Sequence, residues 1–170
     1  GISMASCEQY HITVTGKSGH GSMPHAAIDS ITAAAQIHLA LQEINSREIA
    51  PDEYGVFTTC RFEAGNASNV FPEKAEMLGT IRTLDTDGKI GSQIKTRMTE
   101  IATGIATAMR CEAKVEFADF CPSMVTDSEL ASDALSIMQE LYGPMVIDMA
   151  AINGGKPGGG SEDFAFVSHK

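Results

Sequence analysis

The sequence contains no Trp, and aromatic residues make up only 6% of its 170 positions. Large binding surfaces for sugars or single-stranded nucleic acid rely on exposed aromatic rings. Positive charge is also scarce, because 12 Lys and Arg stand against 22 Asp and Glu, which gives a formal net charge of -10. Neutralising a phosphate backbone requires clustered Lys and Arg. The first deficit argues against such an aromatic surface, and the second excludes an electrostatic nucleic-acid binder.

Long apolar runs are absent as well. No stretch approaches the roughly 20 uninterrupted apolar residues that a membrane-spanning helix requires, and no charged segment followed by an apolar core opens the chain. We therefore expect a soluble, cytoplasmic protein that does not interact with membranes. Its four cysteines are widely spaced and form no CxxC motif, so we expect reduced thiols, with Cys60 and Cys111 buried as small apolar groups.

The hydrophobic pattern predicts four strands and two helices in the first two thirds of the chain. Apolar and polar residues alternate in four segments, which predicts strands at residues 10–15, 54–63, 74–84 and 112–120. Helical spacing of apolar residues predicts helices over 29–45 and 87–109. The order strand, helix, strand, strand, helix, strand is typical of the split βαβ (ferredoxin-like) α+β fold, with both helices on one face of a four-stranded antiparallel sheet. We place this unit at residues 8–120 and expect the strand over 54–63 near a sheet edge.

The remaining residues are organised differently. Residues 126–129 have the spacing of a capping box before an amphipathic helix, which Gly143 and Pro144 end. A strand or extended run over 145–152 and a glycine-rich stretch over 153–164 follow. Residues 121–170 hold too little apolar area to fold alone. We therefore interpret them as part of an incomplete α/β catalytic domain, and residues 1–7 as a fragment of a domain linker.

One loop holds the best candidate for chemistry. Residues 16–25, GKSGHGSMPH, place three glycines and two histidines between a strand and a helix. An imidazole at His20 can donate a hydrogen bond to a developing oxyanion. A surface turn with an incidental histidine and a phosphate cradle are the alternatives, although the spacing matches no phosphate-binding fingerprint. His20 and His25 lack the further ligands that a metal site needs.

Three other places could bind a substrate. Asn69 lies in a non-repetitive loop, where its amide can hold a carbonyl group, and Arg82 offers a planar fork to a carboxylate. The turn that contains Gly159, Gly160 and Ser161 offers unhindered backbone amides and a hydroxyl. A flexible linker is the alternative interpretation of this turn.

Five segments together resemble the M20 family of metallopeptidases and amidohydrolases, most closely its branch of hippurate hydrolases and N-acyl-amino-acid amidohydrolases. They follow one another in the family's order, at residues 3–6, 16–31, 65–72, 79–84 and 160–164. The resemblance implies a two-domain enzyme in which a split βαβ lid, which also forms a homodimer, is inserted into a catalytic domain with two divalent metals, usually zinc.

The same resemblance implies roles for the candidate residues. His20 would be the catalytic lid histidine that stabilises the tetrahedral oxyanion, often in the partner subunit's site. Asn69 and Arg82 match substrate-binding positions of the lid, with Arg82 at the substrate carboxylate. Gly159, Gly160 and Ser161 match a catalytic-domain turn beside the substrate, which would be a small N-acyl amino acid or peptide.

The family's metal-binding segments have no counterpart in the sequence. Five histidines are present, and no Glu-Glu pair occurs. We therefore expect this chain by itself to bind no catalytic metal and to have no hydrolase activity, with the ligands lying before Gly1 and beyond Lys170. The alternative function is a stand-alone ferredoxin-like module for self-association or ligand binding, without catalysis.

Overall fold

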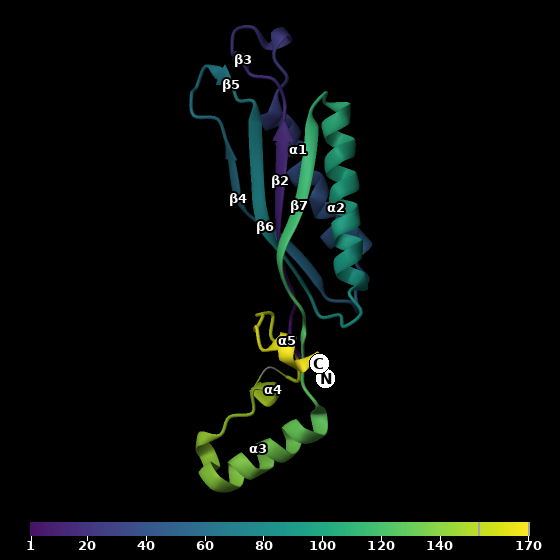
Figure 1. The fold of residues 1–170 in the computed structure, drawn as a ribbon, viewed down its shortest axis with the longest axis vertical. Coiled ribbons are helices and arrows are strands. Elements are labelled where there is room, and N and C mark those ends of the chain that lie inside the picture. Colours follow the sequence, from purple (N-terminus) through teal and green to yellow (C-terminus); the bar gives the residue numbers. More distant parts are fainter. Residues whose placement is uncertain (153, 170) are drawn as a thin grey trace.

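The computed structural model describes residues 1–152 and 154–169, and a four-stranded antiparallel sheet forms its centre (Figure 1). The strands lie in the order β4-β6-β2-β7, so β4 and β7 are the two edges. Their bounds are Cys7–Thr15 for β2, Gly55–Ala64 for β4, Lys74–Thr83 for β6 and Glu112–Cys121 for β7. The predicted α+β fold is confirmed, and so is the edge position of the strand predicted over 54–63.

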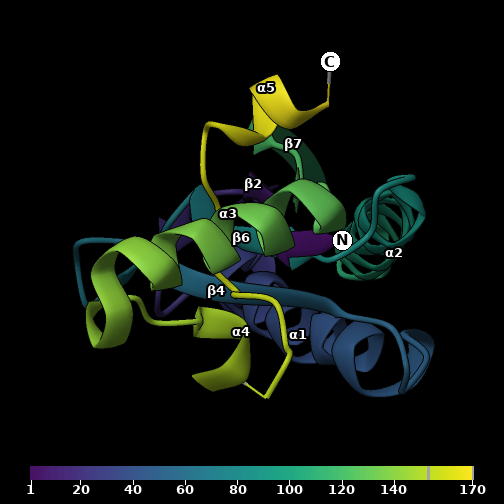
Figure 2. The same cartoon turned by 90° about the horizontal axis from the view of Figure 1, so that it is seen from below.

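Two long helices pack on one face of this sheet. The first, α1 (Ser30–Glu43), begins where the Asp29 carboxylate accepts hydrogen bonds from the amides of Ile31 and Thr32, at 2.9 and 3.1 Å. A π-helical turn (Ile44–Glu48) continues it slightly past the predicted end. The second, α2 (Lys89–Ala108), runs beside α1, as Figure 2 shows from below.

The hydrophobic core lies between the sheet and these helices. Alternate residues of β2 point toward the helices and are buried, whereas their neighbours face the open side of the sheet. The helices contribute the apolar stripes that their spacing predicts. The largest fully buried apolar side chains of the core are Tyr10, Ile12, Val14, Ile37, Leu41, Ile44, Phe57, Met77, Ile81, Ile94 and Met98.

Short elements occupy both ends of the sheet. At one end, β3 (Gly19–His20) pairs with β5 (Val70–Phe71), close to a 3-10 turn (Pro24–Ala26). At the other end, β1 (Ile2–Met4) pairs with β8 (Met124–Val125), and α5 (Ala165–Ser168) lies beside them. We call this second end the neck, because the chain passes through it on its way into and out of the sheet (Figure 1).

Beyond the neck, helix α3 (Ser128–Tyr142) is followed by a 3-10 turn (Gly143–Met145) and the short helix α4 (Met149–Ile152). The strand or extended run expected over 145–152 is therefore wrong in part, because helical turns occupy both its ends. The predicted capping box is not formed. Asp127 and not Thr126 caps α3, by accepting a hydrogen bond from the Leu130 amide at 2.9 Å, and Leu130 stands where a box would need Glu or Gln.

The cysteine prediction holds for one position of two. Cys111 is buried between α2 and β7, whereas Cys60 is exposed. Its exposure follows from its place on the edge strand β4, where the register against β6 shifts between Thr59 and Arg61 and leaves Cys60 outside the regular pairing. Among the described residues, no helix has the length and apolar character needed to span a membrane.

Candidate functional site

The His20 side chain lies exposed at the end of the sheet remote from the neck. The two-residue pairing of β3 with β5 places His20 opposite Val70 and Gly19 opposite Phe71. The Gly21 amide donates to the Asn69 carbonyl at 2.7 Å, which extends this pairing by one step. The loop is therefore anchored by backbone bonds and presents the imidazole at a fixed place.

The partners of the His20 ring determine which nitrogen carries the proton. Its Nδ1 accepts a hydrogen bond from the Ser22 backbone amide at 3.1 Å and lies 2.8 Å from the Ser22 hydroxyl. A backbone amide can only donate, so Nδ1 is the acceptor and the neutral ring carries its proton on Nε2. The Nε2–H group is left to donate outward. Ser22 follows the candidate histidine closely, but its role was not evident from the sequence.

Asn69 belongs to the same end of the molecule. Residues 65–73 connect β4 to β6, and Asn69 shares the backbone bond with Gly21 described above. A pocket of about 220 Å³ opens beside it, between this connection and the start of α1. Its lining residues are Gly21, Asp29, Ile31, Ala67, Ser68, Asn69, Val70, Phe71 and Pro72. The structure thus brings two of the predicted site residues, His20 and Asn69, into one loop cluster.

Arg82 lies at the opposite end of the sheet, near the end of β6. Its guanidinium Nη1 donates to the Gly159 carbonyl at 3.3 Å. The same turn is tied to the neck by the Ala5 amide, which lies 3.0 Å from the Gly158 carbonyl and 2.9 Å from the Gly160 carbonyl. Ser161 follows directly and is half-buried. Arg82, Gly159, Gly160 and Ser161 therefore form a second cluster at the neck.

The two clusters are separated by the length of the sheet. Strand β6 runs from Lys74, beside the His20 loop, to Arg82 and Thr83 at the neck. At about 3.3 Å per residue, the eight steps from Lys74 to Arg82 span roughly 26 Å. Groups this far apart cannot contact one small substrate. One copy of the chain therefore does not assemble all the predicted site residues into one site.

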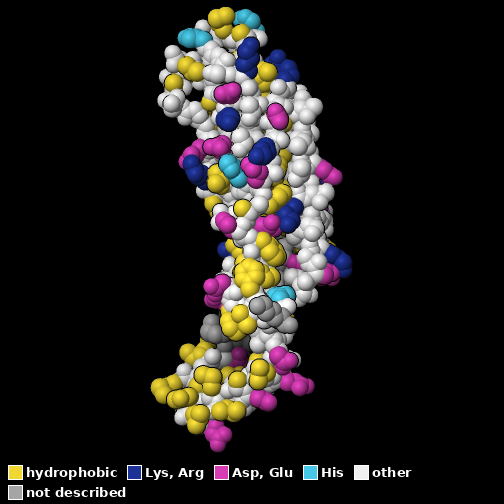
Figure 3. All heavy atoms as spheres, viewed as in Figure 1, with side chains coloured by type: hydrophobic (Ala, Val, Ile, Leu, Met, Phe, Trp, Pro, Cys, Tyr) yellow, Lys and Arg dark blue, Asp and Glu magenta, His cyan; other side chains and the backbone are white. Residues whose placement is uncertain are grey.

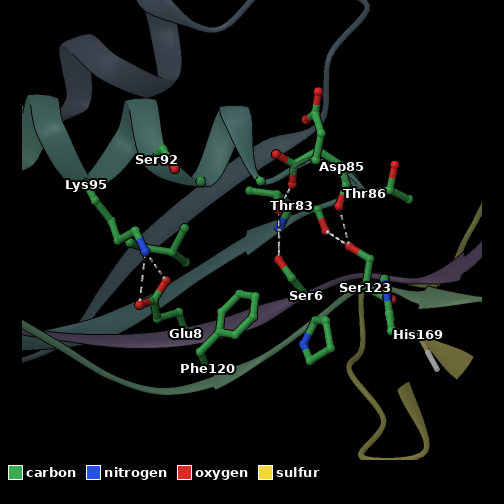
Figure 4. Close-up of a pocket in the computed structure, with 15 residues that line it drawn as sticks. Ser6, Glu8, Thr83, Asp85, Thr86, Ser92, Lys95, Phe120, Ser123 and His169 are labelled. Atoms are coloured by element: carbon green, nitrogen blue, oxygen red, sulfur yellow. Dashed lines mark hydrogen bonds and ion pairs between the residues drawn. The ribbon is translucent and has the colours of Figure 1, made fainter. Parts of the chain in front are cut away.

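The neck also contains a polar cluster that the sequence did not reveal. The Ser6 hydroxyl lies 2.8 Å from the Thr83 hydroxyl and accepts from the Thr83 amide at 2.9 Å. The Ser123 hydroxyl donates to the Thr83 and Asp85 carbonyls at 3.2 and 3.0 Å. Figure 4 shows how these side chains line a pocket of about 340 Å³ next to the Glu8–Lys95 ion pair.

This polar cluster joins segments that are far apart in the sequence. Ser6 precedes β2, Thr83 ends β6 and Ser123 follows β7, and all three side chains are nearly fully buried. No residue type or spacing marks them as related. Their contacts hold together the chain segments that enter and leave the sheet at the neck.

No metal centre is formed by the part of the chain that the structure describes, because nowhere do three or more His, Cys, Asp or Glu side chains gather as metal ligands would. His20 and His25 remain in an exposed loop. The described residues do not fit the dinuclear centre that the resemblance implies. Any such centre would need ligands from outside these residues.

Comparison with known proteins places this chain in a family. The sequence model of the peptidase dimerisation domain of the M20 peptidases matches residues 8–110. The chain belongs to the M20 family. Hippurate hydrolase of Campylobacter jejuni is 34% identical over 166 residues, covering 98% of this chain and 42% of that enzyme. N-acetylcysteine deacetylase of Bacillus subtilis is 33% identical over 168 residues, covering 98% and 42%.

Solved structures of two bacterial proteins have the same arrangement. An aminohydrolase of methicillin-resistant Staphylococcus aureus superposes with a TM-score of 0.80 at 27% identity, over 99% of this chain and 42% of that one. A Bacillus subtilis protein described as a dinuclear metal-binding M20 peptidase gives a TM-score of 0.70 at 28% identity, over 99% and 39%. The M20 chain described here spans about two fifths of the length of the curated relatives it matches.

Proposed function

We propose that this chain is the lid and part of the catalytic region of a metal-dependent amidohydrolase that cleaves the amide bond of N-acyl amino acids or small peptides. In this proposal, residues 8–120 are the lid and dimerisation domain, and residues 121–170 belong to the catalytic domain. The M20 membership and the names of relatives such as hippurate hydrolase support this substrate class. The observation that carries the proposal is the division of the predicted site residues between the two ends of the sheet.

Such a division suits a dimer in which each active site takes residues from both copies. The neck cluster would serve the catalytic domain of its own chain, and the His20 loop would reach the site of the partner. Strand β4 is an open edge of the sheet and exposes Val56 and Phe62, so it is the surface we propose for pairing across a two-fold axis. The peptidase dimerisation match supports self-association.

Within that site, the Nε2–H of His20 would donate a hydrogen bond to the oxyanion that forms when water attacks the amide carbon. The Ser22 amide fixes this donor before substrate arrives, which is what electrostatic stabilisation requires. Asn69 would bind a substrate carbonyl. Arg82 would bind the carboxylate, beside the amides of Gly159 and Gly160 and the hydroxyl of Ser161.

The two divalent metals, zinc by resemblance, would supply the attacking water and would be held by ligands outside the residues described here. A relative described as dinuclear supports their number. Because the described residues offer no ligand set, we expect the 170-residue chain alone to be inactive.

The first test is the His20→Ala substitution in the full-length enzyme. Loss of one preorganised oxyanion donor should lower kcat by about 100-fold or more, with metal content unchanged. Turnover assays on N-acyl amino acids and metal analysis measure both quantities. Unchanged turnover would remove His20 from the mechanism.

The division of the site allows a sharper test by mixing subunits. An H20A subunit and an R82A subunit, each nearly inactive as a homodimer, should form a mixed dimer with one intact site, because His20 acts in the partner and Arg82 in its own chain. The matched control mixes H20A with N69A. Both residues lie in the same loop cluster, so this mixture should restore nothing. Equal restoration by both mixtures, or by neither, would contradict the proposed division.

A further inference from the structure

Two of the four cysteines face each other across the neck. Cys7 opens β2 and Cys121 ends β7, and the two residues lie directly opposite in the antiparallel pairing of these strands. They mark the points where the chain enters and leaves the sheet, on the neck side (Figure 1). Both are partly accessible, in contrast to the buried Cys111.

A bulge in β7 creates this pairing. Gln9 lies opposite Ala118, whereas Cys7 lies opposite Cys121, so a step of two residues on β2 matches a step of three on β7. Asp119, inside the bulge, adopts the left-handed region with φ of 54°. In regular pairing Cys7 would face Phe120, and Cys121 would point to the other side of the sheet. The extra residue therefore brings the two thiols to one face.

The resulting geometry fits a disulfide. Residues directly opposite in an antiparallel pair have Cα atoms about 4.5 to 5.5 Å apart and side chains on the same face. Disulfides join residues whose Cα atoms are about 4.4 to 6.8 Å apart. The two strands thus need no large backbone movement to be bridged.

The surroundings of Cys121 distinguish the two thiols. Its Sγ donates to the Glu162 carbonyl at 3.4 Å, which links the thiol to the residue that follows Ser161. Burial, followed by the influence of Cys7, Asp163 and Glu162, raises the pKa of the Cys121 thiol. Because the thiolate is the reactive form, exchange should begin at Cys7.

We propose that Cys7 and Cys121 form a reversible disulfide across the neck when the chain meets a small-molecule disulfide such as oxidised glutathione. The Cys7 thiolate attacks the glutathione disulfide and releases one glutathione thiol. The Cys121 thiolate then attacks the mixed disulfide at the Cys7 sulfur and releases the second. The two protein thiols are oxidised, one S–S bond forms, and oxidised glutathione is reduced to two thiols.

The disulfide would change the neck in two ways. It covalently ties the strands that enter and leave the sheet, and it removes the hydrogen bond that Cys121 donates to Glu162. The turn of residues 158–163 would lose one of its anchors. An effect on substrate binding rests on the proposed function, whereas formation of the disulfide does not. The disulfide proposal and the proposed function can therefore be refuted separately.

The test uses the 170-residue chain with Cys60→Ser, because the exposed Cys60 would otherwise link two copies. After incubation with oxidised glutathione in native buffer, titration in denaturant should show the loss of two of the three remaining thiols. Peptide mapping should find Cys7 joined to Cys121, and dithiothreitol should restore both thiols. Hydrogen exchange of residues 158–163 should be faster in the oxidised form.

Two variants and one condition make the test decisive. Cys121→Ser should trap glutathione on Cys7, whereas Cys7→Ser should leave Cys121 largely unmodified. Denaturation in urea should slow the internal link, since the fold no longer aligns the thiols. Persistence of all three thiols in native buffer, or a link that forms as fast in urea, would overturn the proposal. Unchanged exchange in the turn would overturn its coupling to the disulfide.

Discussion

The sheet unit (residues 8–120) buries apolar side chains of its helices, whereas helix α3 beyond the neck leaves most of its apolar side chains exposed. Helix α2 buries five residues against the sheet, whereas α3 buries none of its own among the described residues, although both are amphipathic. The exposed apolar side chains beyond the neck appear in Figure 3 as a yellow region below the narrow part of the molecule. The sheet unit therefore has a complete core, and α3 presents a face that the rest of the proposed catalytic domain would cover.

The strongest test of this comparison is a pair of matched truncations. Ile37 on α1 is 0% exposed, and Ile137 on α3 is 58% exposed. Ile37→Ala should lower the free energy of unfolding by about 4 kcal/mol through lost burial and a cavity. Ile137→Ala should change it by less than about 0.5 kcal/mol. Urea denaturation of the 170-residue chain measures both values. A large loss for Ile137→Ala would show that α3 is packed in solution.

Glycine positions test whether close packing accounts for the stability of the sheet unit. A Cβ on Gly79 of β6 would lie 1.9 Å from the Thr58 carbonyl oxygen and 2.7 Å from the Tyr10 ring. Gly79→Ala should therefore cost about 3 kcal/mol or more, because backbone cannot yield to the added methyl group.

Gly104 of α2 is the matched control, since nothing lies within 4 Å of its added Cβ. Gly104→Ala should stabilise the chain by up to about 1 kcal/mol, through better helix propensity. Thermal unfolding followed by circular dichroism compares the two variants. If Gly79→Ala were as mild as Gly104→Ala, the tight contact between β6, β4 and Tyr10 would not hold in solution.

The difference in burial between these two regions also explains which elements the sequence predicted correctly. Within the sheet unit, the apolar period of α2 and the alternation of β2 determine which face is buried, so pattern alone was sufficient for the fold. Beyond the neck, α3 was predicted from its own period, but residues 145–152 were predicted as extended and include helical turns. Their conformation depends on tertiary surroundings that local pattern does not encode.

In the candidate site, the sequence indicated the residues but not the contacts that position them. His20, Asn69 and Arg82 were identified by residue type and by family resemblance. The contacts that position them were not visible in the sequence. The Ser22 amide at the His20 ring and the Gly159 carbonyl at Arg82 are backbone groups, which every residue has and which no pattern marks. The sequence also did not indicate the bulge at Asp119, because the residue with the left-handed backbone conformation there is not Gly, the residue usual at such a position.

The smallest expected effect concerns an ion pair at the end of α1. The Glu48 carboxylate accepts from Arg97 of α2 at 2.6 and 2.9 Å, and these hydrogen bonds hold its pKa below the ordinary value. A folded-state pKa below the unfolded one stabilises the fold above the unfolded pKa, and this contribution is lost as pH falls through the folded value. The stability difference between wild type and Glu48→Gln should therefore be largest near pH 7 and should shrink as the pH falls through the folded-state pKa of Glu48.

The control for this ion pair is Glu140→Gln on the exposed surface of α3, a helix that buries none of its residues. Urea midpoints at several pH values should show a small, pH-dependent loss for Glu48→Gln and almost none for Glu140→Gln. Equal pH profiles for the two variants would mean that the Arg97 contact adds nothing to stability. A loss confined to Glu48→Gln would show that the bond to Arg97, which the packed helices hold in place, contributes to stability.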